Sequence, residues 1–132
     1  MNTGEVYFAL RGAELDPDIA SSALGVLPTR VLRKGIANAK ISSWELSSGE
    51  ISSDVVDVYE LSETVVSRLQ GKAETIRRIT ASTQAEAVLQ VVLTISMNEQ
   101  LSTPAIGFSE AVVQFVAQAG AYIDVDTYRG AS

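Results

Sequence analysis

Residues 6–35 constrain the fold of this chain more than any other segment, because strand, helix and turn signals follow one another there without a gap. The segment reads VYFALRGAELDPDIASSALGVLPTRVLRKG. Apolar side chains alternate over residues 6–10, which predicts a strand with one well-buried side, and Gly12 ends it. The segment therefore opens with a strand of a sheet that buries one of its faces.

A short helix is predicted next, over about residues 17–24. Asp16 is a typical N-cap, and Pro17 suits the first helical position because it has no N–H group to leave unpaired. Gly25 supplies the left-handed residue that closes many helices, and Pro28 prevents continuation. The inward face of this helix is expected to consist of Ile19, Ala23 and Leu24.

The middle of the chain predicts two more extended segments and a helical region. Residues 29–34 and 41–46 are expected to form an antiparallel pair, and the SSGE tetrad after them is a turn signal. A long helical region begins at Asp54, and Gly71 separates it from a second, shorter helix. The apolar stripe of the first of these helices is Val55, Val58, Leu61, Val65 and Leu69.

The last third predicts a strand, a helix and a strand. Residues 88–97 alternate cleanly between two faces, which is typical of a central strand. Ser109 is a plausible N-cap for the last helix, and Gly120 closes it. The final strand is expected over residues 122–128.

These elements predict a single α+β domain over residues 1–132. Its sheet is expected to have five mostly antiparallel strands, with helices packed on one face. The first six segments match a split βαβ (ferredoxin-like) arrangement, and the C-terminal helix and strand extend it. The uncovered sheet face is then the expected place for partners.

The net charge of −6 excludes several classes of partner. Nucleic acids and anionic membranes are bound through clustered Lys and Arg, so neither is expected as the partner of this chain. No apolar run approaches the roughly 20 residues that span a bilayer, and the residues before the first strand lack the pattern expected of a signal peptide. A cytoplasmic location is the simplest interpretation. An acidic surface suits solubility, or a basic protein partner.

The side-chain inventory favours a non-catalytic protein over an enzyme. The chain has no His and no Cys, which excludes Ser-His-Asp and Cys-His nucleophiles and the usual zinc sites. Carboxylate, Lys or Tyr chemistry and oxygen-ligated Mg²⁺ or Ca²⁺ remain possible. No motif points to a catalytic residue, a metal ligand or a cofactor.

The chain resembles the bacterial domain-of-unknown-function family numbered 4279. The similarity rests on the strand that ends at Gly12, on the helix start at residues 15–19, and on the turn at residues 24–29. Residues 34–35, Trp44 and the terminal strand at residues 123–128 also fit the family. The resemblance implies no activity and no catalytic residue. Small acidic domains of this type sometimes serve as immunity proteins against secreted toxins. This comparison is an analogy with a class of proteins and does not rest on individual residues.

Two pairs of acidic residues are candidate ligand sites. Asp124 and Asp126 lie two residues apart on one strand face, where paired carboxylates can share a proton or bind Mg²⁺. The competing explanation is an acidic solvent face on an edge strand. For Asp16 and Asp18, capping and a first-turn acid explain both residues.

Aromatic and basic residues give the remaining candidates. Trp44, Tyr122 and Tyr128 would anchor a partner if they lay on the open sheet face, although Trp44 also fits the edge of the core. Four basic residues lie within a short stretch of this acidic chain, and they are interpreted mainly as a solvated face: Arg30, Arg33, Lys34 and Lys40.

These observations predict a non-catalytic module that binds a protein partner, and an immunity-type neutraliser of a toxin is one form of such a module. The predicted partner-binding residues are Trp44, Tyr122, Asp124, Asp126 and Tyr128. Two alternatives stay open: a small-molecule or divalent-metal-dependent enzyme that uses the carboxylate pair Asp124 and Asp126, and a homo-oligomeric structural module joined through the open face.

Overall fold

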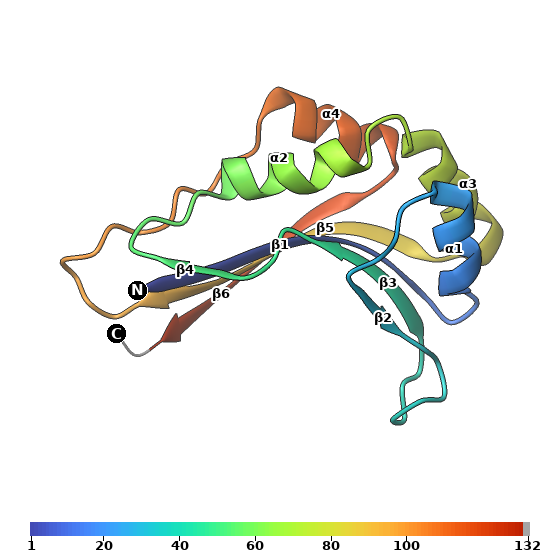
Figure 1. Ribbon diagram of the computed structural model, residues 1–132, viewed down its shortest axis with the longest axis horizontal. Coiled ribbons are helices and arrows are strands. Elements are labelled where there is room, and N and C mark those ends of the chain that lie inside the picture. Colours follow the sequence, from blue (N-terminus) through green and yellow to red (C-terminus); the bar gives the residue numbers. More distant parts are fainter. Residues whose placement is uncertain (131–132) are drawn as a thin grey trace.

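One six-stranded sheet forms the frame of the molecule, and four helices lie together on one of its faces (Figure 1). The computed structural model describes residues 1–130. Its strands are β1 (Asn2–Gly12), β2 (Arg30–Leu32), β3 (Ser42–Ser47), β4 (Ile51–Ser53), β5 (Glu86–Ser96) and β6 (Tyr122–Gly130). Its helices are α1 (Pro17–Leu24), α2 (Val58–Arg68), α3 (Ala73–Thr83) and α4 (Glu110–Gln118). None of the helices described in residues 1–130 has the length and apolar character needed to cross a membrane.

The strand order is β2-β3-β1-β5-β6, and β4 pairs with the beginning of β1. β1 is antiparallel to β3, β4 and β5, whereas β6 runs parallel to β5 over its whole length. The predicted α+β class with a mostly antiparallel sheet is confirmed. The prediction of five strands is wrong, because Ile51–Ser53 forms a short sixth strand beside the start of β1. These three residues lie in a serine-rich stretch and show no alternation of apolar and polar side chains that would predict a strand.

Alternation along β1 separates a helix-covered face from an open face. Val6, Phe8 and Leu10 are completely buried beneath the helices. Phe8 meets Phe115 of α4 edge to face, with ring centroids 5.8 Å apart. The core is completed by the facing residues of the neighbouring strands and helices, among them Leu46, Leu89, Val91, Leu93, Leu61, Val65 and Ile76.

Helix α1 begins as predicted but turns a different side to the core. Asp16 caps it by accepting a hydrogen bond from the Asp18 N–H at 2.9 Å, and Gly25 closes it with φ +67°. Its buried residues are Pro17, Ala20 and Leu24, whereas the predicted core residue Ile19 is 65% exposed. The buried stripe starts at the first helical residue, the proline, and this shifts the inward face away from Ile19 and Ala23.

Helix α2 begins later than predicted. Asp57 is its N-cap and accepts from the Tyr59 N–H at 3.0 Å, so Val55 lies before the helix and is 61% exposed. Val56 takes the buried position instead. The rest of the predicted stripe, Val58, Leu61, Val65 and Leu69, is buried as expected.

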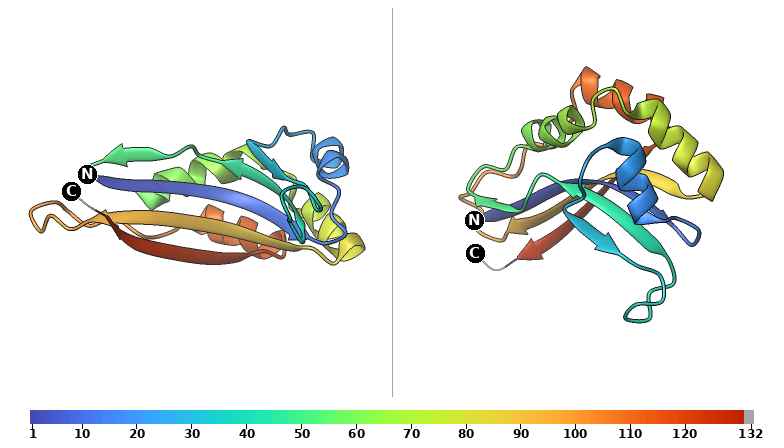
Figure 2. Two further views of the ribbon diagram at one scale, coloured as in Figure 1. Left: turned by 90° about the horizontal axis from the view of Figure 1, so that it is seen from below. Right: turned by 45° about the vertical axis from the view of Figure 1, so that its right-hand side comes forward.

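The sheet arches away from the helices at both edges. The β2–β3 hairpin and the end of β6 both slant away from the helical layer, so the open face is the hollow side of the arch (Figure 2). The described ends of the chain lie close together beside β4 and the end of β6 (Figure 1). The helices therefore leave one continuous, curved sheet surface uncovered.

Candidate functional site

The open face consists of the alternate side chains of each strand that point away from the helices. Its charged and aromatic members come from five strands, as the strand registers show. They are Arg30 of β2; Glu45 of β3; Glu5, Tyr7 and Arg11 of β1; Glu86 of β5; and Tyr122, Asp124, Asp126 and Tyr128 of β6. Five carboxylates against two guanidinium groups give this face a formal charge of −3, half of the chain's −6. Three of the four tyrosines lie here as well.

The most elaborate contacts of the open face surround Arg30. Its Nε donates to Glu45 Oε1 at 2.7 Å, and its Nη2 lies 2.7 Å from Glu5 Oε2. The guanidinium carbon also sits 5.0 Å from the centre of the Tyr7 ring. Hydrogen bonding to Glu45, more than to Glu5, raises the pKa of Arg30 despite its partial burial. Two carboxylates and an aromatic ring thus hold one guanidinium group.

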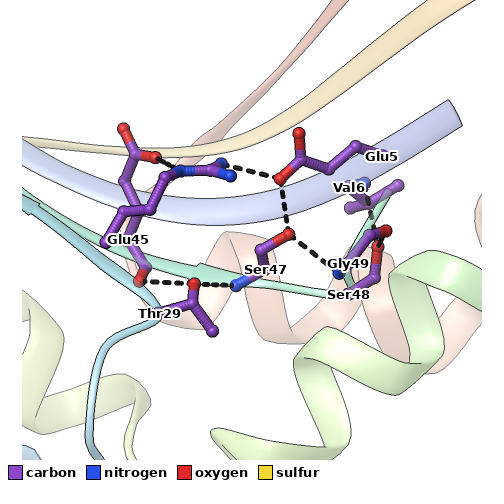
Figure 3. Close-up of polar contacts among 8 residues, drawn as sticks. Glu5, Val6, Thr29, Glu45, Ser47, Ser48 and Gly49 are labelled. Carbon is purple, nitrogen blue, oxygen red and sulfur yellow. Dashed lines mark hydrogen bonds and ion pairs between the residues drawn. The ribbon is translucent and has the colours of Figure 1, made fainter. Parts of the chain in front are cut away.

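Two hydroxyl groups join the strands that carry Glu5 and Glu45 (Figure 3). The Ser47 hydroxyl donates to Glu5 Oε2 and accepts from the Gly49 N–H at 2.9 Å. The Thr29 hydroxyl donates to the Glu45 carbonyl at 3.1 Å and accepts from the Ser47 N–H at 2.9 Å. The Ser47 hydroxyl therefore holds the Glu5 carboxylate in place, and the Thr29 hydroxyl ties the backbone of β3 to the segment before β2.

Burial and charge also act on Tyr7. Its pKa is raised, first because its hydroxyl is partly withdrawn from water and then because Glu45 lies nearby. The neighbouring guanidinium groups of Arg11 and Arg30 oppose the shift without cancelling it. The phenol therefore stays protonated at neutral pH and can donate a hydrogen bond.

A second polar group lies toward β6. Gln90 is almost fully buried at the middle of the open face, and its Nε2 donates to Asp126 Oδ2 at 3.2 Å and to the Asp124 carbonyl at 3.3 Å. Its Oε1 accepts from Arg11 at 3.5 Å. Withdrawal from water, followed by a hydrogen bond with Glu86, raises the pKa of Tyr122. The hydrogen bond from Gln90 positions the Asp126 side chain, whereas the Asp124 carboxylate has no hydrogen bond or ion pair with the described residues.

The structure brings four of the five predicted binding residues together and separates the fifth. Tyr122, Asp124, Asp126 and Tyr128 form one exposed column on the open face, with Tyr122 46% and Tyr128 57% exposed. Trp44 points to the opposite face, is completely buried, and donates from Nε1 to Ser21 Oγ of α1 at 3.0 Å. Trp44 therefore belongs to the core, because α1 covers that part of β3, and it is not available to a partner on the open face.

Sequence reasoning missed the Arg30 cluster and treated its arginine as part of a solvated stretch. The available signal was the alternation of Glu5 with Tyr7, but only the register of β1 against β3 brings Glu45 to them. Arg33 is also paired, with its Nη2 2.9 Å from Asp18 Oδ1, and this interaction lowers the pKa of Asp18. That exposed pair links the end of β2 to the start of α1.

Two further features of the described residues concern metal ions and cavities. No group of three or more acidic, His or Cys side chains within residues 1–130 is placed to hold a metal ion. A hollow of about 690 Å³ lies at the ends of β5 and β6, lined in part by Met97, Glu99, Leu101, Tyr128 and Arg129.

Comparison with known proteins gives one result. No curated protein and no solved structure matches the chain. The DUF4279 family, described as a domain of unknown function, matches residues 2–130 and so includes every described helix and strand. The resemblance recognised in the sequence is confirmed. The chain belongs to the DUF4279 family.

Proposed function

We propose that this protein is a non-catalytic binding module whose open sheet face binds a basic protein. The observation that carries the proposal is the composition of that face, which combines five carboxylates with three tyrosines on a surface that no helix covers. Tyrosine and arginine dominate the energetics of protein interfaces, and a ring can stack on a partner's guanidinium group.

The charge of the face supports a basic partner over other partners. A formal charge of −3 on one face repels nucleic acid and attracts a positively charged protein over a Debye length of about 8–10 Å. Acidic inhibitors gain association rate against basic targets in this way, which is how an immunity-type protein would neutralise a toxin. Cytoplasmic action fits this function.

The strand order supports a related proposal about the topology of the fold. The order β2-β3-β1-β5, with antiparallel neighbours throughout, supports a split βαβ (ferredoxin-like) start to the fold. In such an arrangement the helices stay on one side, and the opposite sheet face is free to evolve as a binding surface.

The proposal is tested by affinity purification from the source cells with three baits analysed by quantitative mass spectrometry. The baits are the wild type, an open-face variant Asp124→Asn/Asp126→Asn, and a control Glu60→Gln/Glu63→Gln on the outer side of α2. Both variants lose the same charge. We expect basic proteins that the wild type and the control enrich to be lost from the open-face variant. Equal recovery with all three baits, or loss with the control as well, contradicts the proposal.

A further inference from the structure

The outer edge of β6 is the feature of the open face that defines how a partner would attach. We infer that an extended segment of a basic protein, with Arg or Lys at alternate positions, adds to β6 as a further strand. The inference rests on the proposed function and makes it specific: backbone hydrogen bonds would join the partner to β6, and its cations would lie over the open face.

The backbone of β6 is paired on one side only. Its nine residues follow β5 in parallel from Tyr122 to Gly130, and no other strand in residues 1–130 lies beyond it. The backbone bond from the Met97 N–H to the Gly130 carbonyl at 3.3 Å is at the very end of the strand. A strand edge of this length, without proline or a bulge, is a template for pairing with another chain, and its charged residues limit which chains can pair with it.

The side chains next to this edge suit cations. Tyr122, Asp124, Asp126 and Tyr128 alternate along β6, so two carboxylates lie between two exposed rings, about 7 Å apart along the strand. Residues directly opposite on an added strand would lie about 5 Å away, within reach of a salt bridge. The Asp124 carboxylate forms no hydrogen bond or ion pair with the described residues, and so it is available for a salt bridge.

The other edge of the same sheet shows this chemistry already in use. Arg30 lies on the short edge strand β2, directly opposite Glu45 of β3, and its guanidinium group lies over the open face. There it contacts Glu5 and the ring of Tyr7. Acidic and aromatic residues therefore bind a cation from the edge strand β2 at one side of this sheet. At the other side, β6 presents the same residue types, and no strand within residues 1–130 pairs with its outer edge.

Charge favours a basic partner over a second copy of this chain. If two β6 strands paired antiparallel about Val125, Asp124 of each copy would lie opposite Asp126 of the other. Like charges directly opposite each other destabilise a strand pair. A partner segment with Arg or Lys at alternate positions would place cations opposite Asp124 and Asp126, so attraction replaces this repulsion.

The test is an NMR titration of the ¹⁵N-labelled protein with the peptide acetyl-Thr-Arg-Val-Arg-Val-Arg-Thr-amide. We expect the largest amide shifts in β6, and binding at least about tenfold weaker with the Asp124→Asn/Asp126→Asn variant. The control variant Glu60→Gln/Glu63→Gln should bind like the wild type. A peptide with Gln in place of each Arg should bind more weakly by a similar factor.

Backbone methylation separates strand addition from simple charge attraction. Two further peptides carry N-methyl groups on the Arg residues or on the Val residues, which point to opposite edges of an extended peptide. If the peptide adds to β6 as a strand, only one of its edges pairs with β6. Methyl groups on that edge should abolish binding, and methyl groups on the other edge should leave it unchanged. If both bind as the parent does, or if shifts fall on β1 and β3 and leave β6 unchanged, the inference is overturned while the proposed binding face stands. No shift at about 1 mM peptide also overturns it, and the affinity-purification result is unaffected by that outcome.

Discussion

At the scale of single residues, Arg30 organises the acidic side of the open face. The side chains of Glu5 and Glu45 are only 14% and 18% exposed, so each carboxylate depends on the guanidinium group that bridges them. Arg30 itself is 49% exposed, and water screens part of the attraction. The cluster therefore serves more to hold the two carboxylates in position than to stabilise the fold.

Replacing Arg30 should have a modest but specific cost. We expect Arg30→Ala to lower the free energy of unfolding by about 1 kcal/mol, because two poorly exposed carboxylates lose their cation. Adding Glu5→Gln and Glu45→Gln should recover part of that loss, as the uncompensated charges disappear. Urea unfolding measures both. Arg33→Ala, which breaks the exposed pair with Asp18, is the matched control and should cost less. Equal losses from the two arginines would contradict this account.

Tyr7 should make the stability of the protein depend on pH in the alkaline range. Its folded pKa is raised above 10.0, so the folded chain holds the phenolic proton more firmly than the unfolded chain. This contribution to stability is fully present below the ordinary tyrosine pKa and is lost as pH rises through the raised value. The unfolding free energy of the wild type should therefore fall more steeply than that of Tyr7→Phe as the pH rises above about 10, the ordinary tyrosine pKa. Urea titrations at several pH values measure it, and parallel curves for the two proteins would refute the assignment.

Alternation correctly predicted which residues share a face, but not what covers that face. It placed Tyr122, Asp124, Asp126 and Tyr128 together, and they form one exposed column. It left two interpretations of Trp44, because a strand of mostly serine neighbours does not show which side is inward. The helix α1, which contacts Trp44 through Ser21, decides between them, and that contact is between segments far apart in the chain.

At the scale of elements, local capping signals predicted helix starts and ends better than helix faces. Asp16, Gly25 and Ser109 occupy the predicted positions in α1 and α4. The predicted inward side of α1 was correct at Leu24 and wrong at Ile19 and Ala23, because an eight-residue helix has too few turns for its apolar stripe to be unambiguous. Strand β4 was missed because its pairing depends on the long β1 strand and not on its own sequence.

Close packing between β1 and the segment before α2 depends on Gly4. A Cβ atom at this position would lie 2.5 Å from Val56 Cγ1 and 3.2 Å from Leu93 Cδ2, and both neighbours are completely buried. We expect Gly4→Ala to lower the unfolding free energy by about 1–3 kcal/mol. Because Val56→Ala removes the nearer methyl group, the double variant should lose less than the sum of the two single losses. Thermal and urea unfolding of the three variants measure this, and strict additivity would show that the two positions do not clash.

At the scale of the whole molecule, the fold assigns different tasks to its two sheet faces. One face buries the core beneath four helices, and the other is an arched surface that carries half of the chain's net charge (Figures 1 and 2). The α+β class and the mostly antiparallel sheet were predictable, because they follow from patterns within each segment. The gathering of five carboxylates on one face was not, since it follows from the strand registers.

Hydrogen–deuterium exchange of the protein, alone and in complex with the partner recovered by the wild-type bait, tests the binding face most directly. The account predicts slower exchange of backbone amides in β6, where a partner strand would pair, and weaker protection in β1 and β3. Amides on the outer sides of α2 and α4 should exchange at unchanged rates. Protection confined to the helices, with β6 unchanged, would contradict the claim that the open face is where this protein binds.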